Sequence, residues 1–164
     1  MDNLKVTGYI PGAIGRVTEL HATYYSKHWG FDLFFETKVA TELSELLNRF
    51  NETRDGFWVA TVNGRIAGSV AIDGKEVQTD GARLRFFIVD PEFQGRGLGN
   101  MLLREAIEFC RRSNFRRLYL STFAGLDPAR HLYEKFGFVL GEEQFDWFCS
   151  LGWLKMRFLE PYNR

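Results

Sequence analysis

Apolar residues recur along the chain with two different periods, and the points where the period changes divide it into strands and helices. Residues 4–10 (LKVTGYI) have the composition of a short strand, which a proline and a glycine end. From Ala13 to about Trp29 the apolar positions follow the three- and four-residue spacing of an amphipathic helix, and this spacing returns in residues 31–50. The first third of the chain therefore predicts one strand followed by two helices.

The middle of the chain has the two-residue alternation of strands. Residues 56–74 contain two β-branched and aromatic runs joined by Asn63-Gly64, a pair that favours the tight turn of a hairpin. Residues 83–90 (RLRFFIVD) predict a third strand, which Pro91 ends. The alternation predicts one strand face with Leu84, Phe86 and Ile88 and an opposite face with Arg85, Phe87 and Val89.

The last part of the chain alternates helices with strands. Helical spacing recurs in residues 98–113 and 126–136, a strand is predicted at 115–123, and two more strands lie within 138–160. A hairpin meander that leads into β-α-β crossovers predicts an α/β (α+β) fold, with a mixed central sheet of about seven strands and about four helices on both faces. No repeat or low-complexity linker interrupts the pattern, so residues 1–164 are expected to form a single domain.

Composition excludes several classes of protein. The chain has 164 residues, 45% of them hydrophobic, which is enough to build a core of its own. Basic and acidic residues number 21 each, so the protein has no net positive charge to attract nucleic acid or an anionic membrane. No apolar stretch is long enough for a membrane span or a secretory signal, so we expect a cytoplasmic protein. Cys110 and Cys149 lie in apolar segments without metal-ligand spacing, which indicates free thiols and no metal site.

Three glycines crowd residues 93–100 (FQGRGLGN), between the strand that ends at Pro91 and the following helix. Unblocked backbone N–H groups at a helix N-terminus form a site for phosphate, and Arg96 adds a positive charge. The spacing does not match the Gly-x-Gly-x-x-Gly of dinucleotide-binding loops, and no Lys followed by Ser or Thr comes after the last glycine as in a P-loop. The segment therefore predicts a phosphate site of another kind.

Two segments resemble a known family. FIVDPEFQGRGLGNMLL (residues 87–103) resembles the coenzyme A pyrophosphate motif of the GNAT superfamily of N-acetyltransferases: Gln or Arg, two residues, Gly, one residue, Gly or Ala. LDPARHLYEKFGF (residues 126–138) resembles that superfamily's second motif. The stretches ARLRFFIVDPEFQGRGLG and STFAGLDPARHLY are also similar to the acetyltransferase half of bacterial proteins that fuse a MarR-type regulator to a GNAT domain.

The resemblance implies acetyl-CoA as co-substrate and assigns residues to it. The backbone of one strand would pair with the pantetheine arm, as in β-augmentation, and the glycine segment would hold the pyrophosphate. Tyr133 occupies the position of the general acid that protonates the leaving thiolate. The implied cofactor-binding residues are Phe87, Ile88, Val89, Gln94, Gly95, Arg96, Gly97, Leu98, Gly99 and Asn100.

A general base is less clearly marked. Asp32 and Glu36 lie four residues apart on one face of the second helix, with His28 just before it, and each could equally be a solvated or capping group. Glu36 is favoured because Phe35 suggests an apolar wall that would raise its pKa, and a chain of water molecules is the alternative. His21 and His131 are interpreted as packed or surface residues, not as ligands.

The predicted function is transfer of the acetyl group of acetyl-CoA to a primary amine by direct attack in a ternary complex. The alternative is a non-catalytic module that binds acyl-CoA as a sensor or partner domain. The acceptor, whether a small molecule or a peptide amine, is left open, although part of the aromatic set between Tyr24 and Phe35 is expected to line its pocket. The last two strands, rich in aromatic residues (Trp147, Phe148, Trp153 and Phe158), are expected either to form a homodimer contact or to finish the core.

Overall fold

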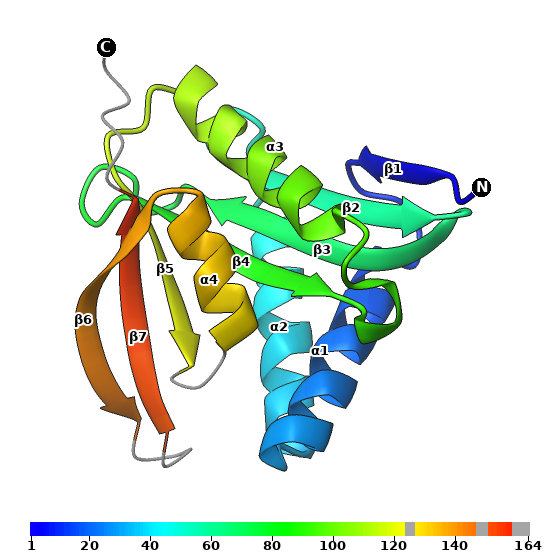
Figure 1. Cartoon of the computed structure of the whole chain (residues 1–164). Helices are drawn as coiled ribbons and strands as arrows, with labels where there is room; N and C mark the ends of the chain where they lie inside the picture. Colours follow the sequence, from blue (N-terminus) through cyan, green and yellow to red (C-terminus); the bar gives the residue numbers. More distant parts are fainter. Residues whose placement is uncertain (124–126, 147–150, 159–164) are drawn as a thin grey trace.

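A seven-stranded sheet with helices on both faces forms the protein in the computed structural model, which describes residues 1–123, 127–146 and 151–158 (Figure 1). The strands are β1 (Leu4–Thr7), β2 (Gly56–Val62), β3 (Arg65–Asp73), β4 (Ala82–Val89), β5 (Leu118–Phe123), β6 (Phe138–Asp146) and β7 (Leu151–Phe158). The helices are α1 (Ala13–Trp29), α2 (Leu33–Asn48), α3 (Leu98–Arg112) and α4 (Asp127–Lys135), with a 3-10 turn η1 (Pro91–Phe93). The predicted fold class and order of elements are confirmed.

Two neighbouring strands in the middle of the sheet diverge and leave a gap between them. The order is β1-β2-β3-β4-β5-β7-β6, and every neighbouring pair is antiparallel except β4 and β5. These two parallel strands pair only where Ala82–Leu84 faces Leu118–Leu120. Beyond this short ladder they diverge, as Figure 1 shows. The second half of β4 therefore has no β5 neighbour, and its edge toward β5 is open.

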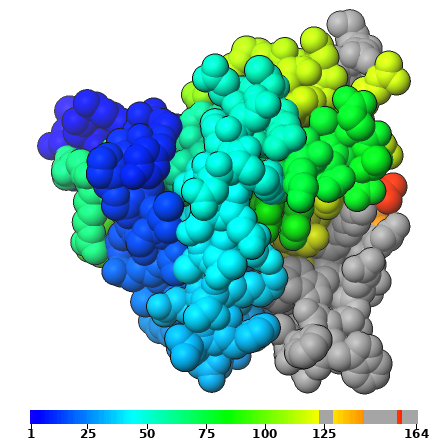
Figure 2. Space-filling view, turned by 180° about the vertical axis from the view of Figure 1, so that it is seen from behind, coloured from blue at the N-terminus to red at the C-terminus, as the bar shows by residue number. Residues whose placement is uncertain are grey.

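The two faces of the sheet carry separate cores. Helices α3 and α4 cover one face, and α1 and α2 cover the other, where Figure 2 shows them side by side. Helix α3 contributes one apolar stripe to its core because its buried residues recur at helical spacing. Each fully buried leucine of that stripe contributes about 2 kcal/mol. The buried residues of the stripe are Leu98, Leu102, Leu103, Ala106, Ile107 and Cys110.

The predicted faces of β4 are wrong beyond Arg85 because a β-bulge interrupts the alternation. Phe86 has φ 53°, a left-handed conformation that is rare for a bulky residue, and the register with β3 shifts at this point. Ser69 supports the bulge, since its hydroxyl donates a hydrogen bond to the Phe86 carbonyl at 2.6 Å. Phe87 consequently packs in the core of α3 together with Leu84, whereas Phe86 packs in the core of α1 and α2.

Some sequence predictions fall outside what the structure describes. Trp147, Phe148 and Cys149 lie outside the described residues, so the expected homodimer contact of the last two strands stays a prediction. Within the described residues, no helix combines the length and the apolar character that crossing a membrane requires.

Candidate active site

A cavity of about 550 Å³ lies at the gap between β4 and β5 and receives residues from both faces of the sheet. The α3 and α4 face contributes the glycine segment, Leu132 and Tyr133. The α1 and α2 face contributes His21, Tyr25 and other residues. Because one hollow is reached from both faces, two substrates can enter from opposite sides of the sheet and meet between the diverging strands.

The glycine segment is shaped for an anion on the α3 side. Gly95 and Gly97 adopt left-handed backbone angles, φ 80° and 85°, and a Cβ on either would meet nothing within 4 Å. Gly97 is the N-cap of α3, whose first turn contains no acidic residue, so the helix dipole and the first N–H groups are available to a negative charge. Position 99 requires glycine for a different reason: a Cβ there would lie too close to its neighbours, 2.9 Å from Leu132 Cδ2 and 3.4 Å from Phe87 Cζ.

The structure brings nearly all the predicted cofactor-binding residues together. Arg96 is the exception: it is not among the residues that line the cavity, and its guanidinium forms an ion pair with Asp2 and lies 5.2 Å from the ring centre of Phe93. The predicted residues that do line the cavity are Phe87, Ile88, Val89, Gln94, Gly95, Gly97, Leu98, Gly99 and Asn100. Gln94 also donates from Nε2 to the Val89 carbonyl at 3.3 Å, which ties the loop to the open end of β4.

Tyr133 lines the cavity from α4 and is buried, with 6% of its surface exposed. Its ring lies 5.5 Å from that of Phe87 and 5.9 Å from that of Phe138, measured between centres. Burial raises the pKa of the phenol, and the neighbouring Tyr25 raises it further. Tyr133 therefore keeps its proton at neutral pH and can act as a donor inside the cavity.

His21 lines the opposite side of the cavity and is neutral. Its Nδ1 donates to the Val17 carbonyl at 2.8 Å, because a carbonyl can only accept, so the other nitrogen, Nε2, carries no proton in the neutral ring. The ring is parallel to that of Tyr25, with 6.4 Å between centres, and meets Phe86 edge-on at 6.1 Å. Burial lowers the pKa of His21 to about 4, and the bond to Val17 opposes this only in part. The packed histidine expected from the sequence is what the structure shows.

The buried imidazole predicts a loss of stability in mild acid. The unfolded chain protonates His21 as the pH falls through 6.5, whereas the folded chain does so only near pH 4. The free energy of unfolding should therefore fall by about 3 kcal/mol between these values, in addition to the contribution of other groups. Urea denaturation at several pH values should show a weaker fall for His21→Phe, while His131→Gln, at an exposed position, should follow the wild type. Equal slopes for both variants would contradict the assignment.

The predicted bases lie away from the cavity wall. Glu36, Asp32 and His28 are exposed, and none of them is among the residues that line the cavity. The backbone carbonyl of Asp32 accepts hydrogen bonds from the amides of Phe35 and Glu36, as expected at the start of α2. Phe35 itself does line the cavity. The apolar wall expected beside Glu36 therefore exists, but it is formed by the ring and does not enclose the carboxylate.

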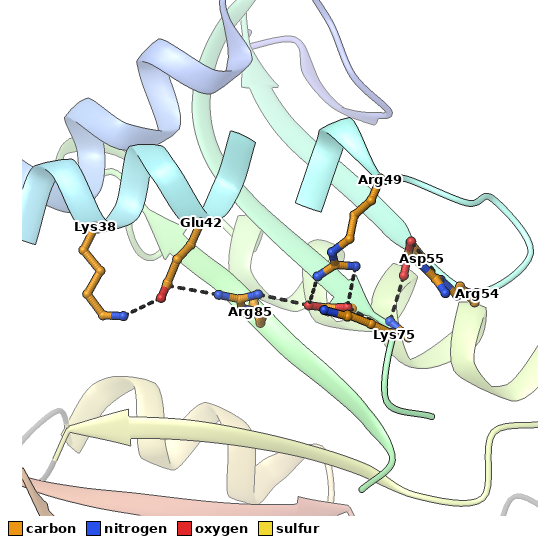
Figure 3. Close-up of polar contacts among 9 residues, drawn as sticks. Lys38, Glu42, Arg49, Arg54, Asp55, Lys75 and Arg85 are labelled. Atoms are coloured by element: carbon orange, nitrogen blue, oxygen red, sulfur yellow. Dashed lines mark hydrogen bonds and ion pairs between the residues drawn. The ribbon is translucent and has the colours of Figure 1, made fainter. Parts of the chain in front are cut away.

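Sequence reasoning missed three charged residues of the wall, Glu42, Arg83 and Arg85. Figure 3 shows Arg85 in a row of charges: its guanidinium donates to Glu42 at 3.1 Å and to Asp73 at 3.0 Å. Burial alone would raise the pKa of Asp73, but hydrogen bonds from Arg49, the Lys75 amide and Arg85 lower it to about 2. The available signal was the presence of two arginines inside an otherwise apolar central strand.

The known proteins that resemble this chain in sequence include N-acetyltransferases. The model of the acetyltransferase (GNAT) family matches residues 15–138. MJ1207, an uncharacterized N-acetyltransferase of Methanocaldococcus jannaschii, is 29% identical over 137 residues, which are 81% of this chain and 58% of that protein. The N-acetylaspartate synthetase of Danio rerio is 30% identical over 118 residues, 71% of this chain and 42% of that protein. The chain thus spans about half the length of these two relatives.

Among solved structures, the spermidine N-acetyltransferase of Vibrio cholerae, crystallised with CoA and spermine, superposes with a TM-score of 0.73. The match covers 98% of both chains at 21% sequence identity. At this identity the likeness establishes the shared fold.

Proposed function

The chain belongs to the acetyltransferase (GNAT) family, and we propose that it transfers the acetyl group of acetyl-CoA to a primary amine while both substrates are bound. The observation that carries this proposal is the single cavity that joins the glycine segment and Tyr133 on one face of the sheet to a separate set of residues on the other. Donor and acceptor can therefore meet at the gap between β4 and β5. Under this proposal the chain acts as an acyltransferase.

The residues present fit acetyl-CoA. The N-terminus of α3 offers unblocked amides, a left-handed glycine cap and no acidic side chain, which suits a pyrophosphate. The second half of β4 has an open edge, which suits the amide-bearing pantetheine arm because amides can pair with a free strand edge. Phe87 and Leu132 add apolar surface beside these groups. The match is to a long ligand with an anionic end and a polar, extended arm.

When bound, acetyl-CoA supplies the acyl group as an activated thioester. The amine nitrogen forms a bond to the acyl carbon, the carbon–sulfur bond breaks, and the sulfur leaves with the electron pair. Tyr133 donates its phenolic proton to that sulfur, and the proton lost by the amine restores the phenol by way of solvent. The products are the N-acetyl amine and CoA thiol. Because burial raises the pKa of Tyr133, the phenol holds its proton at neutral pH and is present as a donor when the sulfur leaves.

Direct attack is favoured over an acetylated enzyme. Among the residues that the structure describes, the cysteine is Cys110; it is fully buried on the apolar stripe of α3, and burial raises the pKa of its thiol to about 12, so it offers no thiolate near neutral pH. Intact-protein mass spectrometry after incubation with acetyl-CoA, without an amine, should show the unmodified mass. A stoichiometric, amine-labile acetyl adduct would contradict direct attack.

A sensor module that binds acyl-CoA without turnover remains the second candidate function, and the resemblance to MarR-fused domains stays a prediction. Both functions require acetyl-CoA to bind. They differ in whether an added amine causes release of CoA thiol, and in whether Tyr133 matters to anything beyond packing.

Glu36 is the base proposed from the sequence, and its exposed position allows a direct test. Because the carboxylate does not line the cavity, we expect Glu36→Gln to change kcat/KM less than about twofold from pH 6 to pH 9, with the amine losing its proton to solvent. Steady-state rates across this range would check it. A loss of about 100-fold at the acid end only, with Glu19→Gln as an exposed control on α1, would instead make Glu36 the base.

A further inference from the structure

Arg83 is an unpaired cation in the cavity wall. It lies on β4 two residues before Arg85, it lines the cavity, and its side chain makes no hydrogen bond or ion pair with any residue the structure describes. Its Nε is buried from solvent and has no partner. A buried donor or charge without a partner destabilises a fold, so stability does not explain why an arginine occupies this position.

The neighbouring Arg85, by contrast, has a structural role, because carboxylates of the chain pair with it. Arg85 donates to Glu42 on α2 and to Asp73 on β3, and Figure 3 shows its guanidinium next to Glu42. Asp73 in turn receives both terminal nitrogens of Arg49, at 3.0 and 2.7 Å. The carboxylates near Arg83 are therefore engaged by other cations. Burial lowers the pKa of Arg83 and the positive charge of Arg85 lowers it further, while Tyr119, Glu42 and Asp73 oppose this shift without forming a hydrogen bond or ion pair with Arg83.

The rest of this side of the cavity does not supply an anion. His21 is neutral, and Tyr24, Tyr25 and Phe35 present aromatic rings. Among the described lining residues, the charges are those of Glu42, Arg83 and Arg85, and Glu42 is held by Arg85 and by Lys38. The one charge left unbalanced in this wall is positive. A polyamine would meet a cation here, whereas a carboxylate would find an unoccupied guanidinium.

We propose that the acceptor is an amino acid whose carboxylate binds Arg83 while its amine faces the gap between β4 and β5. The guanidinium presents a planar fork of N–H donors that matches the two oxygens of a carboxylate, and this pairing is stronger than one between neutral groups. The assignment rests on the proposed acetyl transfer and narrows its acceptor to amines that carry a carboxylate. The aromatic residues nearby leave room for an apolar part of the acceptor next to its charged groups.

The test compares matched acceptors. Free L-amino acids, the corresponding amino acid amides, peptides that begin with aspartate, and spermidine would be offered with acetyl-CoA to the full chain, and kcat/KM measured for each. The wild type should prefer amino acids over their amides by about 10- to 100-fold, as for loss of a hydrogen bond to a charged group. A preference for the aspartyl peptides over free amino acids would replace the proposed acceptor by a protein N-terminus. Equal rates for acids and amides would overturn the proposal.

Variants separate the role of Arg83 from folding. Arg83→Gln should abolish the preference for the carboxylate chiefly by raising KM for the amino acid, and Arg83→Lys should retain part of it because the charge remains. Arg104→Gln, at an exposed site on α3, is the matched control and should behave as the wild type. A preference that survives in Arg83→Gln would overturn the proposal.

Binding measured without turnover distinguishes the proposed carboxylate site from the proposed acetyl transfer. Amino acids and amides would be titrated into the protein saturated with CoA, with and without Arg83→Gln, and the heat of binding measured. If no amine supports thiol release but amino acids bind through Arg83, acetyl transfer fails and the carboxylate site stands. If transfer occurs without any carboxylate preference, the site assignment fails and acetyl transfer stands.

Discussion

Tyr133→Phe is expected to lower kcat about 100-fold while leaving the affinity for acetyl-CoA within about twofold of the wild type. The substitution removes one hydroxyl from a ring that packs between Phe87 and Phe138, so the cavity keeps its shape. What is lost is the proton donor to the departing sulfur. Burial raises the pKa of this phenol, so in the wild type the donor should be present throughout the working pH range. Initial rates of thiol release and calorimetric titration with acetyl-CoA would measure the two quantities.

The control for this variant is the same change at Tyr119. Tyr119 lies on β5, and it is not among the residues that line the cavity. Tyr119→Phe should retain the wild-type kcat. Wild-type turnover of Tyr133→Phe at every pH would remove Tyr133 from the mechanism, and a parallel loss of thermal stability and activity would reduce its role to packing.

Gly97→Val is expected to weaken acetyl-CoA binding at least 10-fold, and the chain offers a close control in Gly12. Both glycines are helix N-caps in the left-handed region, with φ 85° at Gly97 and 90° at Gly12, and a Cβ on either would meet nothing within 4 Å. Each substitution should therefore cost a similar backbone strain of about 1–2 kcal/mol. Gly97 alone lines the cavity, where a side chain would cover the amides offered to the pyrophosphate.

Denaturant melts and acetyl-CoA titrations of the two valine variants separate these effects. Similar losses of stability with a loss of affinity in Gly97→Val alone would assign the glycine segment to the cofactor. If both variants bind acetyl-CoA equally well, the N-terminus of α3 does not hold the pyrophosphate. If both lose affinity equally, the effect is one of global stability.

The donor side of the site could be predicted from the sequence because its function depends on backbone. The glycine segment needs left-handed angles and bare amides, and these requirements restrict the residue type at positions 95 and 97. Their spacing before an amphipathic helix is then sufficient to place them at a helix N-terminus. The order of helices and strands could also be predicted, because the spacing of apolar residues differs between a helix and a strand.

The acceptor side could not be predicted in the same way because it depends on how helices are rotated and where a strand bulges. Glu36 and Glu42 belong to one helix but point about 120° apart around it, and only the packed structure shows that Glu42 lies at the cavity. The bulge at Phe86 has no composition signal and inverts the faces of β4 after Arg85. Arg83 was visible in the sequence, yet its lack of a partner is a property of the assembled wall.

The most direct test of the central claim, acetyl transfer from acetyl-CoA to an amine, is a thiol-release assay in which acetyl-CoA is held saturating and the amine is varied. If the protein is an acetyltransferase, release of free CoA should rise with amine concentration to saturation, with one acetylated amine formed per thiol, and the rate should fall about 100-fold in Tyr133→Phe. Tight binding of acetyl-CoA without amine-dependent thiol release across amino acids, amides, polyamines and peptides would contradict it, and would identify the protein as a module that binds acyl-CoA without using it.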